Sequence, residues 1–231
     1  MKKLVVIAAF CAALSGGSGA QAADECDGLM VCVPVAGPWV VVPTGTSVPR
    51  PRVEYQLTCP RGYVVAGLDA RLSDRGIDVT FIGKLGSPIN PGISTGRSVT
   101  FVASYVGTTV STPTFRPFIG CMPASGGGGG IPTAIGAVKP GEPTTRRVAA
   151  ARVRPGSRTV ASGCRREELL VDASHAFAFP MAQPPSATVI GMVSGTRAVR
   201  GERVVVSARG DAELGRIRAI VQVHAVCSKV R

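Results

Sequence analysis

The sequence predicts an all-β protein made of two tandem antiparallel β-sandwich-like domains, related by internal duplication and joined by a glycine-rich linker. Apolar and polar residues alternate with a period of two, most clearly where Ile217, Ala219 and Val221 share one face of a predicted strand. Many short stretches of this kind are separated by Gly and Pro turn signals, which is typical of antiparallel sandwiches.

The duplication is predicted from a segment that occurs twice. Val53–Leu68 reads VEYQLTCPRGYVVAGL and returns 95 residues later, over Val148–Gly163, as VAAARVRPGSRTVASG. Val and Ala recur at matched positions, and a proline follows the first strand of each copy. We therefore expect each copy to form a β-hairpin with a proline-led turn.

The N-terminus has the organisation of a secretory signal peptide. Met1-Lys2-Lys3 precedes an apolar run over 4–14, and Ala20-Gln21-Ala22 supplies a cleavage site after Ala22 or Ala23. The apolar run is about half the length that spans a bilayer, so we expect no transmembrane segment. The protein is predicted to be secreted, either extracellular or periplasmic, after residues 1–22 are removed.

Cleavage leaves an even number of cysteines, which in an exported chain predicts disulfides. Nearly equal separations favour one long loop in each half, Cys59 with Cys121 and Cys164 with Cys227, and one short loop from Cys26 to Cys32. A zinc site is the competing interpretation. It is disfavoured because the chain has no Cys-x2-Cys pair, so no metal and no cofactor is predicted.

The first half is predicted to begin with an N-terminal Cys loop and edge strand over 23–50, in which Pro38 and Pro43 flank a short apolar run and Trp39 covers the end of a core. The first β domain spans 51–123. Its predicted strands are 53–59, 63–72, 77–82, 99–106 and 115–121, with a surface loop over 83–96.

Five consecutive glycines at 126–130 lie within a Gly- and Pro-rich linker predicted over 124–145. The second, basic β domain then spans 146–231. Its predicted strands are 147–153, 158–164, 169–179, 187–193, 204–208 and 217–227, and only 165–171 could form a helical turn.

The formal net charge is +12, and most of it lies after residue 139. An uneven positive charge concentrates anionic partners such as acidic polysaccharide. An arginine-rich composition without a functional role is the simpler explanation, and both interpretations remain open. Stacking aromatics are missing beside the arginines, so sequence-specific binding of nucleic acid is not expected.

Candidate catalytic residues are sparse. Gly92–Gly96 matches Gly-x-Ser-x-Gly, but a strand follows it where serine hydrolases have a helix. His175 and His224 are the only histidines. Although Asp172 and Ser174 precede His175, neighbours on a strand alternate faces and cannot converge as a triad. The two histidines could instead meet across the sheet as a pH-sensitive or metal-binding pair.

Two weaker patterns are better explained without function. Asp69, Asp74 and Asp78 lack the dense order of a calcium loop, so they are interpreted as solvated hairpin charges. Arg209-Gly210-Asp211 resembles an integrin-binding tripeptide but is also ordinary sequence between two strands.

The strongest candidate is a basic set on one predicted hairpin, which could hold phosphate or carboxylate groups through forked hydrogen bonds. It consists of Arg146, Arg147, Arg152, Arg154 and Arg158. The predicted function is a secreted, disulfide-stabilised, non-catalytic binding or structural protein of the cell envelope or extracellular space, with an anionic polysaccharide or envelope polymer as partner. The alternative is a secreted hydrolase that uses His175 or His224.

Overall fold

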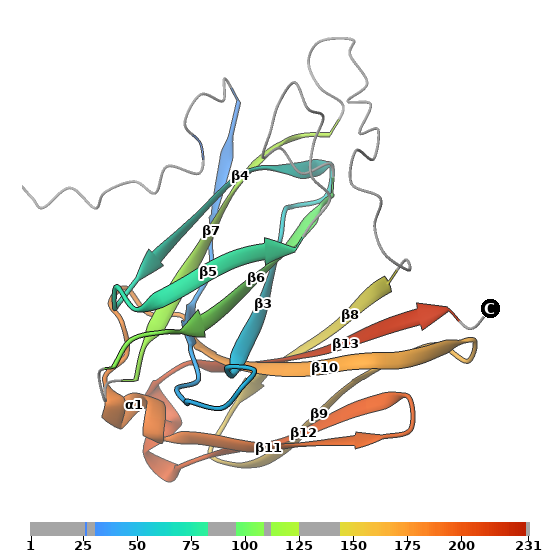
Figure 1. Ribbon diagram of the computed structural model, residues 1–231. Helices are drawn as coiled ribbons and strands as arrows, with labels where there is room; N and C mark the ends of the chain where they lie inside the picture. Colours follow the sequence, from blue (N-terminus) through green and yellow to red (C-terminus); the bar gives the residue numbers. More distant parts are fainter. Residues whose placement is uncertain (1–25, 27–30, 83–95, 109–111, 125–143, 230–231) are drawn as a thin grey trace, which may run out of the picture.

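A computed structural model describes residues 26, 31–82, 96–108, 112–124 and 144–229 (Figure 1). The predicted signal peptide, most of the 83–96 loop, the linker glycines and residues 92–95 of the Gly-x-Ser-x-Gly match lie outside these residues. Strands make up most of the described chain, and the paired strands are antiparallel, which confirms the all-β prediction.

The strands of the first half are β1 (Val33–Ala36), β2 (Trp39–Val41), β3 (Arg52–Thr58), β4 (Tyr63–Leu72), β5 (Ile77–Ile82), β6 (Ser98–Tyr105) and β7 (Thr114–Pro123). The second half contains β8 (Thr144–Val153), β9 (Gly156–Gly163), β10 (Glu168–Phe179), α1 (Ala187–Gly191), β11 (Val193–Arg200), β12 (Arg203–Gly210), the 3-10 helix η2 (Ala212–Arg216) and β13 (Ala219–Lys229).

Each half of the chain forms two facing layers of strands. We call the first half the first unit and the second half the second unit. In the first unit β1, β2 and β4 pair with β7, and the sheet β3-β6-β5 faces them. In the second unit β8, β13 and β10 form one layer. The other layer contains β11, β12 and β9, because Pro155 bridges Gly210 at one end of β9 and the Cys164 N–H donates to the Glu202 carbonyl at the other, over 2.9 Å.

The two units share one seven-stranded sheet, ordered β1-β7-β2-β10-β13-β8 with β4 also paired to β7. The strand β2 bonds to β7 and β10 at once, and Trp39 is buried. The prediction that the Trp39 segment is an edge strand is therefore wrong. Its flanking prolines, Pro38 and Pro43, lie outside the three-residue strand, so they do not interrupt its hydrogen bonds.

The two predicted hairpins are also wrong. β3 pairs with β6 while β4 pairs with β7, and β8 pairs with β13 while β9 lies beside β12. The short connections at 59–62 and 154–155 therefore carry the chain from one layer to the other. Alternation alone could not reveal this, because a strand has the same period of two whether its neighbour is hydrogen-bonded or opposite it.

One predicted strand is replaced by a helix. Residues 187–191 form α1, whose first turn is capped by Ser186, since its hydroxyl accepts from the Val189 N–H. The strand β11 follows it and was missed. The helical turn predicted over 165–171 is also wrong, because β10 begins at Glu168.

The units have the same strand order. In the first unit the sheet β3-β6-β5 faces β7, and in the second unit the sheet β11-β12, with β9 beside β12, faces β13. A β-bulge follows Val65, which lies opposite Cys121, and another follows Leu170, which lies opposite Cys227. By these criteria β3 corresponds to β9. The two similar segments, 53–68 and 148–163, consequently do not occupy equivalent places.

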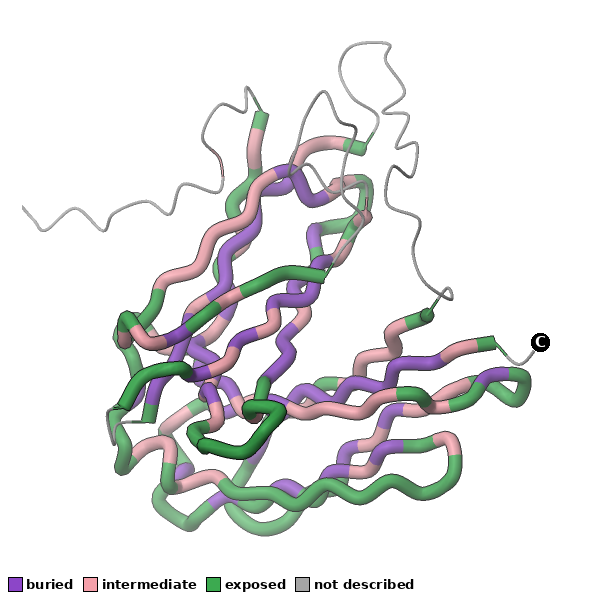
Figure 2. Tube along the Cα trace, in the orientation of Figure 1, coloured by how far each residue is buried: buried purple, intermediate pink, exposed green. Residues whose placement is uncertain are grey.

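The cores lie between the layers of each unit and consist mainly of Val, Ala, Ile and Phe (Figure 2). Ala176 and Ala178 of β10 belong to the core of the first unit, and Val41 of β2 packs against the core of the second. The units are therefore joined by apolar packing as well as by the shared sheet.

Candidate functional site

The three disulfides pair as predicted: Cys26 with Cys32, Cys59 with Cys121 and Cys164 with Cys227. Each long-loop disulfide joins the residue after a strand of the three-stranded layer to the last strand of the facing layer. They therefore staple the two layers of each unit together.

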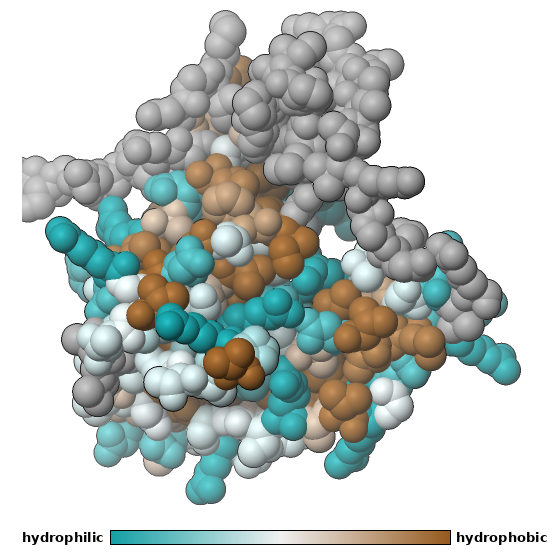
Figure 3. All heavy atoms as spheres, viewed as in Figure 1, coloured by the Kyte–Doolittle hydropathy of each residue, from teal (hydrophilic) through white to brown (hydrophobic). Residues whose placement is uncertain are grey.

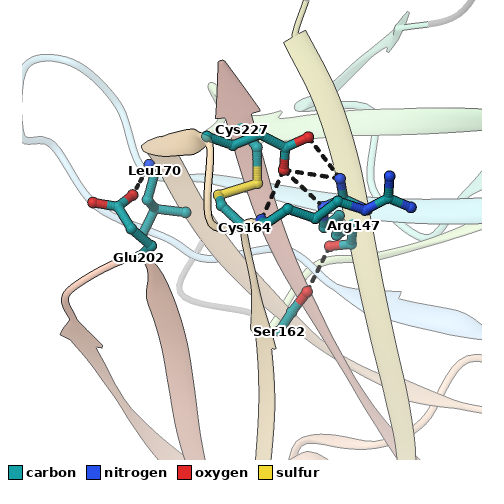
Figure 4. The surroundings of a disulfide bond; sticks show 8 residues. Arg147, Ser162, Cys164, Leu170, Glu202 and Cys227 are labelled. Carbon is teal, nitrogen blue, oxygen red and sulfur yellow. Dashed lines mark hydrogen bonds and ion pairs between the residues drawn. A yellow bond between two sulfur atoms is a disulfide. The ribbon is translucent and has the colours of Figure 1, made fainter. Parts of the chain in front are cut away.

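The second staple is surrounded by a polar cluster (Figure 4). The Arg147 guanidinium donates to both oxygens of Glu168 at 2.7–3.1 Å, and the Arg165 N–H donates to the same carboxylate at 2.8 Å. The hydrogen bonds from Arg147 lower the pKa of Glu168 most, followed by the one from the Arg165 backbone. Cys164, Glu168 and Cys227 are close enough to hold a metal, but both sulfurs are in the disulfide and Arg147 occupies the carboxylate.

A buried ion pair lies where β3 packs on the shared sheet. Glu54 has 1% of its side chain exposed and accepts from Arg146 at 2.5 and 3.3 Å and from the Ser174 hydroxyl at 2.9 Å. Glu54 alternates with Val53 and Tyr55 in the sequence, a pattern that by itself predicts a solvent-exposed side chain. The face of β3 that carries Glu54 is instead covered by the second unit, so the carboxylate is buried with an arginine and a hydroxyl as partners.

Beside this pair, Gln222 closes the open edge of β3. Its side-chain oxygen accepts from the Gln56 N–H at 2.7 Å and its amide donates to the Gln56 carbonyl at 3.2 Å, as a neighbouring strand would. These bonds orient the amide, so His224 Nε2, 2.7 Å from the same oxygen, must be the donor. His224 Nδ1 is buried without a partner among the described residues.

The two histidines do not come together. His224 faces the first unit, whereas His175 lies on the other face of the sheet, against Phe177 at 5.6 Å between ring centroids. Burial lowers the pKa of His224 to about 4 and, together with the charge of Arg197, lowers the pKa of His175. Both imidazoles are therefore neutral at neutral pH.

The predicted basic set does not form one cluster. Arg146 and Arg147 are neighbours on β8 and point to opposite faces, where each is held by a carboxylate, Glu54 and Glu168 respectively. The other three arginines of the set are exposed: Arg152, Arg154 and Arg158.

Sequence reasoning missed a basic surface on the second unit, which we call the outer face. On β12 the side chains of Val204, Val206 and Ala208 are buried in the core. Because side chains alternate along a strand, Arg203 and Arg209 face the solvent. The residues of β11 that pair with these positions lie on the same face, and so do the residues of β9 that alternate with the buried ones. Its polar members are Arg200, Arg203, Arg209, Ser157, Thr159, Ser194, Thr196 and Ser207, and none of its positions on the three strands is acidic. The alternation over 203–209 was a signal that could have identified it.

A cleft of about 780 Å³, which we call the junction cleft, lies where the loop before β3 meets β10. Its charged lining consists of Arg50, Arg52, Arg197 and Asp172, and Arg52 pairs with Asp172 at 3.0 Å. Ser174 and His175 line it as well. Sequence analysis missed this site because its residues come from three separate parts of the chain.

The three aspartates predicted to lie on one hairpin and the Arg-Gly-Asp tripeptide do not form binding sites in the described structure. Asp74 accepts from the Gly76 N–H at 2.7 Å and thereby stabilises the turn before β5, while Asp69 is in β4 and Asp78 is in β5. In the Arg209–Asp211 tripeptide, Gly210 is buried against the Arg154 carbonyl.

Comparison with protein-family models, curated proteins and solved structures gave no match. Among the described residues, no helix is long and apolar enough to cross a bilayer.

Proposed function

We propose that this is an exported, non-catalytic binding protein of the cell envelope or extracellular space, which docks an acidic polymer on the outer face of its second unit. The observation that carries the proposal is the composition of that face: three arginines, five hydroxyl residues and no acidic side chain on the strands β9, β12 and β11. Such a surface attracts phosphate, sulfate or carboxylate groups and offers hydroxyls for further hydrogen bonds.

The spacing of the arginines suits an extended ligand. Arg203 and Arg209 lie on one strand, about 20 Å apart at roughly 3.3 Å per residue. Arg200 is the cross-strand partner of Arg203. A polymer that lies along β12 would contact all three guanidinium groups, whereas a single small anion could not.

Neighbouring acidic residues do not neutralise the middle of this face. The Glu202 carboxylate turns toward β10 and accepts from the Leu170 N–H (Figure 4). Asp211 follows the end of β12, at the start of η2. The positive charge of the outer face therefore remains available to a ligand.

The non-catalytic part of the proposal is supported by the hydrogen bonds of the nucleophile and base candidates. The Ser174 hydroxyl donates to Glu54 and not to an imidazole, while His224 donates to Gln222. A serine hydrolase needs the imidazole as the acceptor of the serine proton. Export is supported by the three disulfides, which persist in oxidising compartments.

We also infer that the two units descend from one duplicated module. The support is their common strand order, the matching bulges after Val65 and Leu170, and the equivalent staples Cys59–Cys121 and Cys164–Cys227. A second copy would then be free to acquire a basic face while the first retained a nearly balanced charge.

Salt elution of the full chain from immobilised heparin tests the proposal. We expect Arg203→Gln with Arg209→Gln to elute at clearly lower salt than the wild-type chain, since two ionic contacts are lost. The matched control is Arg61→Gln with Arg75→Gln, which removes the same charge from exposed sites of the first unit. Equal shifts in the two double variants would show that net charge alone causes retention and would refute the outer face as a site.

A further inference from the structure

The junction cleft exists because β2 is short. β13 pairs with one edge of β10 along its length, whereas β2 pairs with the other edge only at Ala178 and Phe179. The remainder of that edge is open where residues 172–177 line the cleft. Arg197 of β11 reaches this edge and donates to the Ala173 carbonyl.

The open edge supplies backbone donors. Because backbone groups alternate in direction along a strand, His175 and Phe177 present their N–H groups on the same edge as Ala173. The Ala173 N–H is already taken by the Asp172 carboxylate at 2.8 Å. The N–H groups of His175 and Phe177 have no hydrogen-bond partner among the described residues on this edge, so they can serve a ligand.

The charge of the cleft is positive. Three guanidinium groups line it against one carboxylate, and that carboxylate is engaged by Arg52. Among the described residues Arg50 has no side-chain partner, and it is exposed. Within the described part of the chain Arg197 makes one side-chain hydrogen bond, to the Ala173 carbonyl, which leaves its other N–H groups available.

The opposite side of the cleft is apolar and stiff. Pro43, Pro49 and Pro51 line it, and their fixed φ angles restrict the loop without a ligand. Phe177 contributes an aromatic surface next to His175. A volume of about 780 Å³ is within the range of small-molecule sites.

We propose that the junction cleft binds a carboxylate attached to an apolar body. The carboxylate lies at Arg197 and the open edge of β10, and the apolar body packs against the prolines and Phe177. The planar fork of arginine matches the two oxygens of a carboxylate. The same chemistry is offered by a free organic acid and by the C-terminus of a peptide. This site is separate from the outer face, so either proposal can fail without the other.

Chemical-shift mapping of the full isotope-labelled chain tests the site with two probe pairs. Benzoate is compared with benzamide, and N-acetyl-alanyl-phenylalanine with its amide, because each pair differs in the charge of one group. We expect both acids to shift the resonances of residues 173–177 and 197, and both amides to bind more weakly. Response to benzoate alone would identify a site for free acids, and tighter binding of the peptide acid would identify a site for peptide ends.

Arginine variants distinguish specific binding in the junction cleft from nonspecific attraction of acids to positive charge. We expect Arg197→Gln to weaken acid binding about tenfold or more, the effect of losing a charged hydrogen bond. The control is Arg166→Gln, an exposed arginine of the second unit outside both the cleft lining and the outer face, and its affinity should be unchanged. Arg50→Gln, which breaks no described side-chain contact, repeats the test if Arg197→Gln does not fold.

Three outcomes would refute the proposal: no shifts with either acid, equal binding of acids and amides, or equal weakening by Arg197→Gln and Arg166→Gln. Normal heparin retention of Arg197→Gln and Arg50→Gln would show that the outer face is unaffected.

Discussion

Glu54 is a residue whose expected environment, solvent, differs from its environment in the folded protein, a buried interface between the two units. Its position in an alternating strand places it opposite Val53 and Tyr55, on a face that the pattern assigns to solvent. In the structure that face is covered by the second unit, and Glu54 is the buried acceptor for Arg146 and Ser174. A buried carboxylate depends on its partners, because desolvation is expensive without them.

Removing one partner of the Arg146–Glu54 ion pair should therefore destabilise the folded protein. We expect Arg146→Met to lower the free energy of unfolding by about 3–5 kcal/mol, because Glu54 would remain buried without its cationic partner. Urea denaturation measures the change. Arg52→Met is the control, since the Arg52–Asp172 pair is exposed and should contribute at most about 1 kcal/mol. Similar losses in both variants would contradict the assigned importance of burial.

His224 should make stability depend on pH. Its folded pKa of about 4 lies below the ordinary value of 6.5, so the unfolded chain takes up the proton first as the pH falls. The contribution of the neutral imidazole to stability is therefore complete above 6.5 and is lost between 6.5 and about 4.

The ring resonances of His224, followed by NMR during acidification, should stay in the neutral position well below pH 6.5 and change near 4. In His224→Gln, urea denaturation should show a smaller loss of stability across the same interval. A midpoint near the ordinary value in the folded protein would contradict the burial of this ring.

At the scale of elements, each of the two long-loop disulfides joins the two facing layers of one unit. Cys164 and Cys227 are 63 residues apart, and closing such a loop restricts the unfolded chain. The Arg147–Glu168 ion pair lies beside the Cys164–Cys227 disulfide.

We expect Cys164→Ala with Cys227→Ala to lower stability by about 4 kcal/mol on the chain-entropy account. Cys26→Ala with Cys32→Ala, which opens a loop of only six residues' separation, should cost about 2 kcal/mol. Thermal or urea unfolding of the two double variants gives the comparison. A larger loss from the short loop would contradict the loop-length explanation.

The exposed apolar side chains are also a feature of elements. Leu169, Val171 and Val199 are exposed near the ends of β10 and β11, and brown spheres mark apolar surface on this side of the second unit in Figure 3. Phe81 and Ile82 are exposed on β5, the edge of the three-stranded sheet.

At the scale of the whole molecule, the shared sheet makes the units interdependent. β2 of the first unit bonds to β10 of the second, and Ala176 and Ala178 complete the first core. Two independent domains on a flexible tether would lack these contacts.

We consequently expect one cooperative unfolding transition for the full chain. We also expect that a protease site inserted at 126–130 can be cut without separating the fragments, which should elute together in gel filtration. Ala176→Asp in the cut protein is the control, because a charge in the first core should release them. Separation of the unmodified cut fragments would contradict the single-body arrangement.

Features of this protein that depend on neighbouring residues could be predicted from the sequence, and features that depend on distant contacts could not. The strands over 63–72 and 77–82 have the predicted bounds, and the disulfides pair as their spacing suggested. Residues 187–191 form a helix although their apolar residues also suit a strand, and the N-cap at Ser186 is the local signal that favours the helix. The basic set was divided because adjacent residues on a strand, Arg146 and Arg147, face opposite sides.

By itself, the amino-acid sequence determined the all-β character, most of the strand positions and the three disulfides, because alternation, turn residues and cysteine spacing act over short distances or in pairs. Only the tertiary structure decided which strands face each other, that β2 joins the units, and that the junction cleft and the outer face exist. The physical reason is that layer assignment depends on which apolar faces bury one another, and a strand carries the same pattern whichever partner it finds.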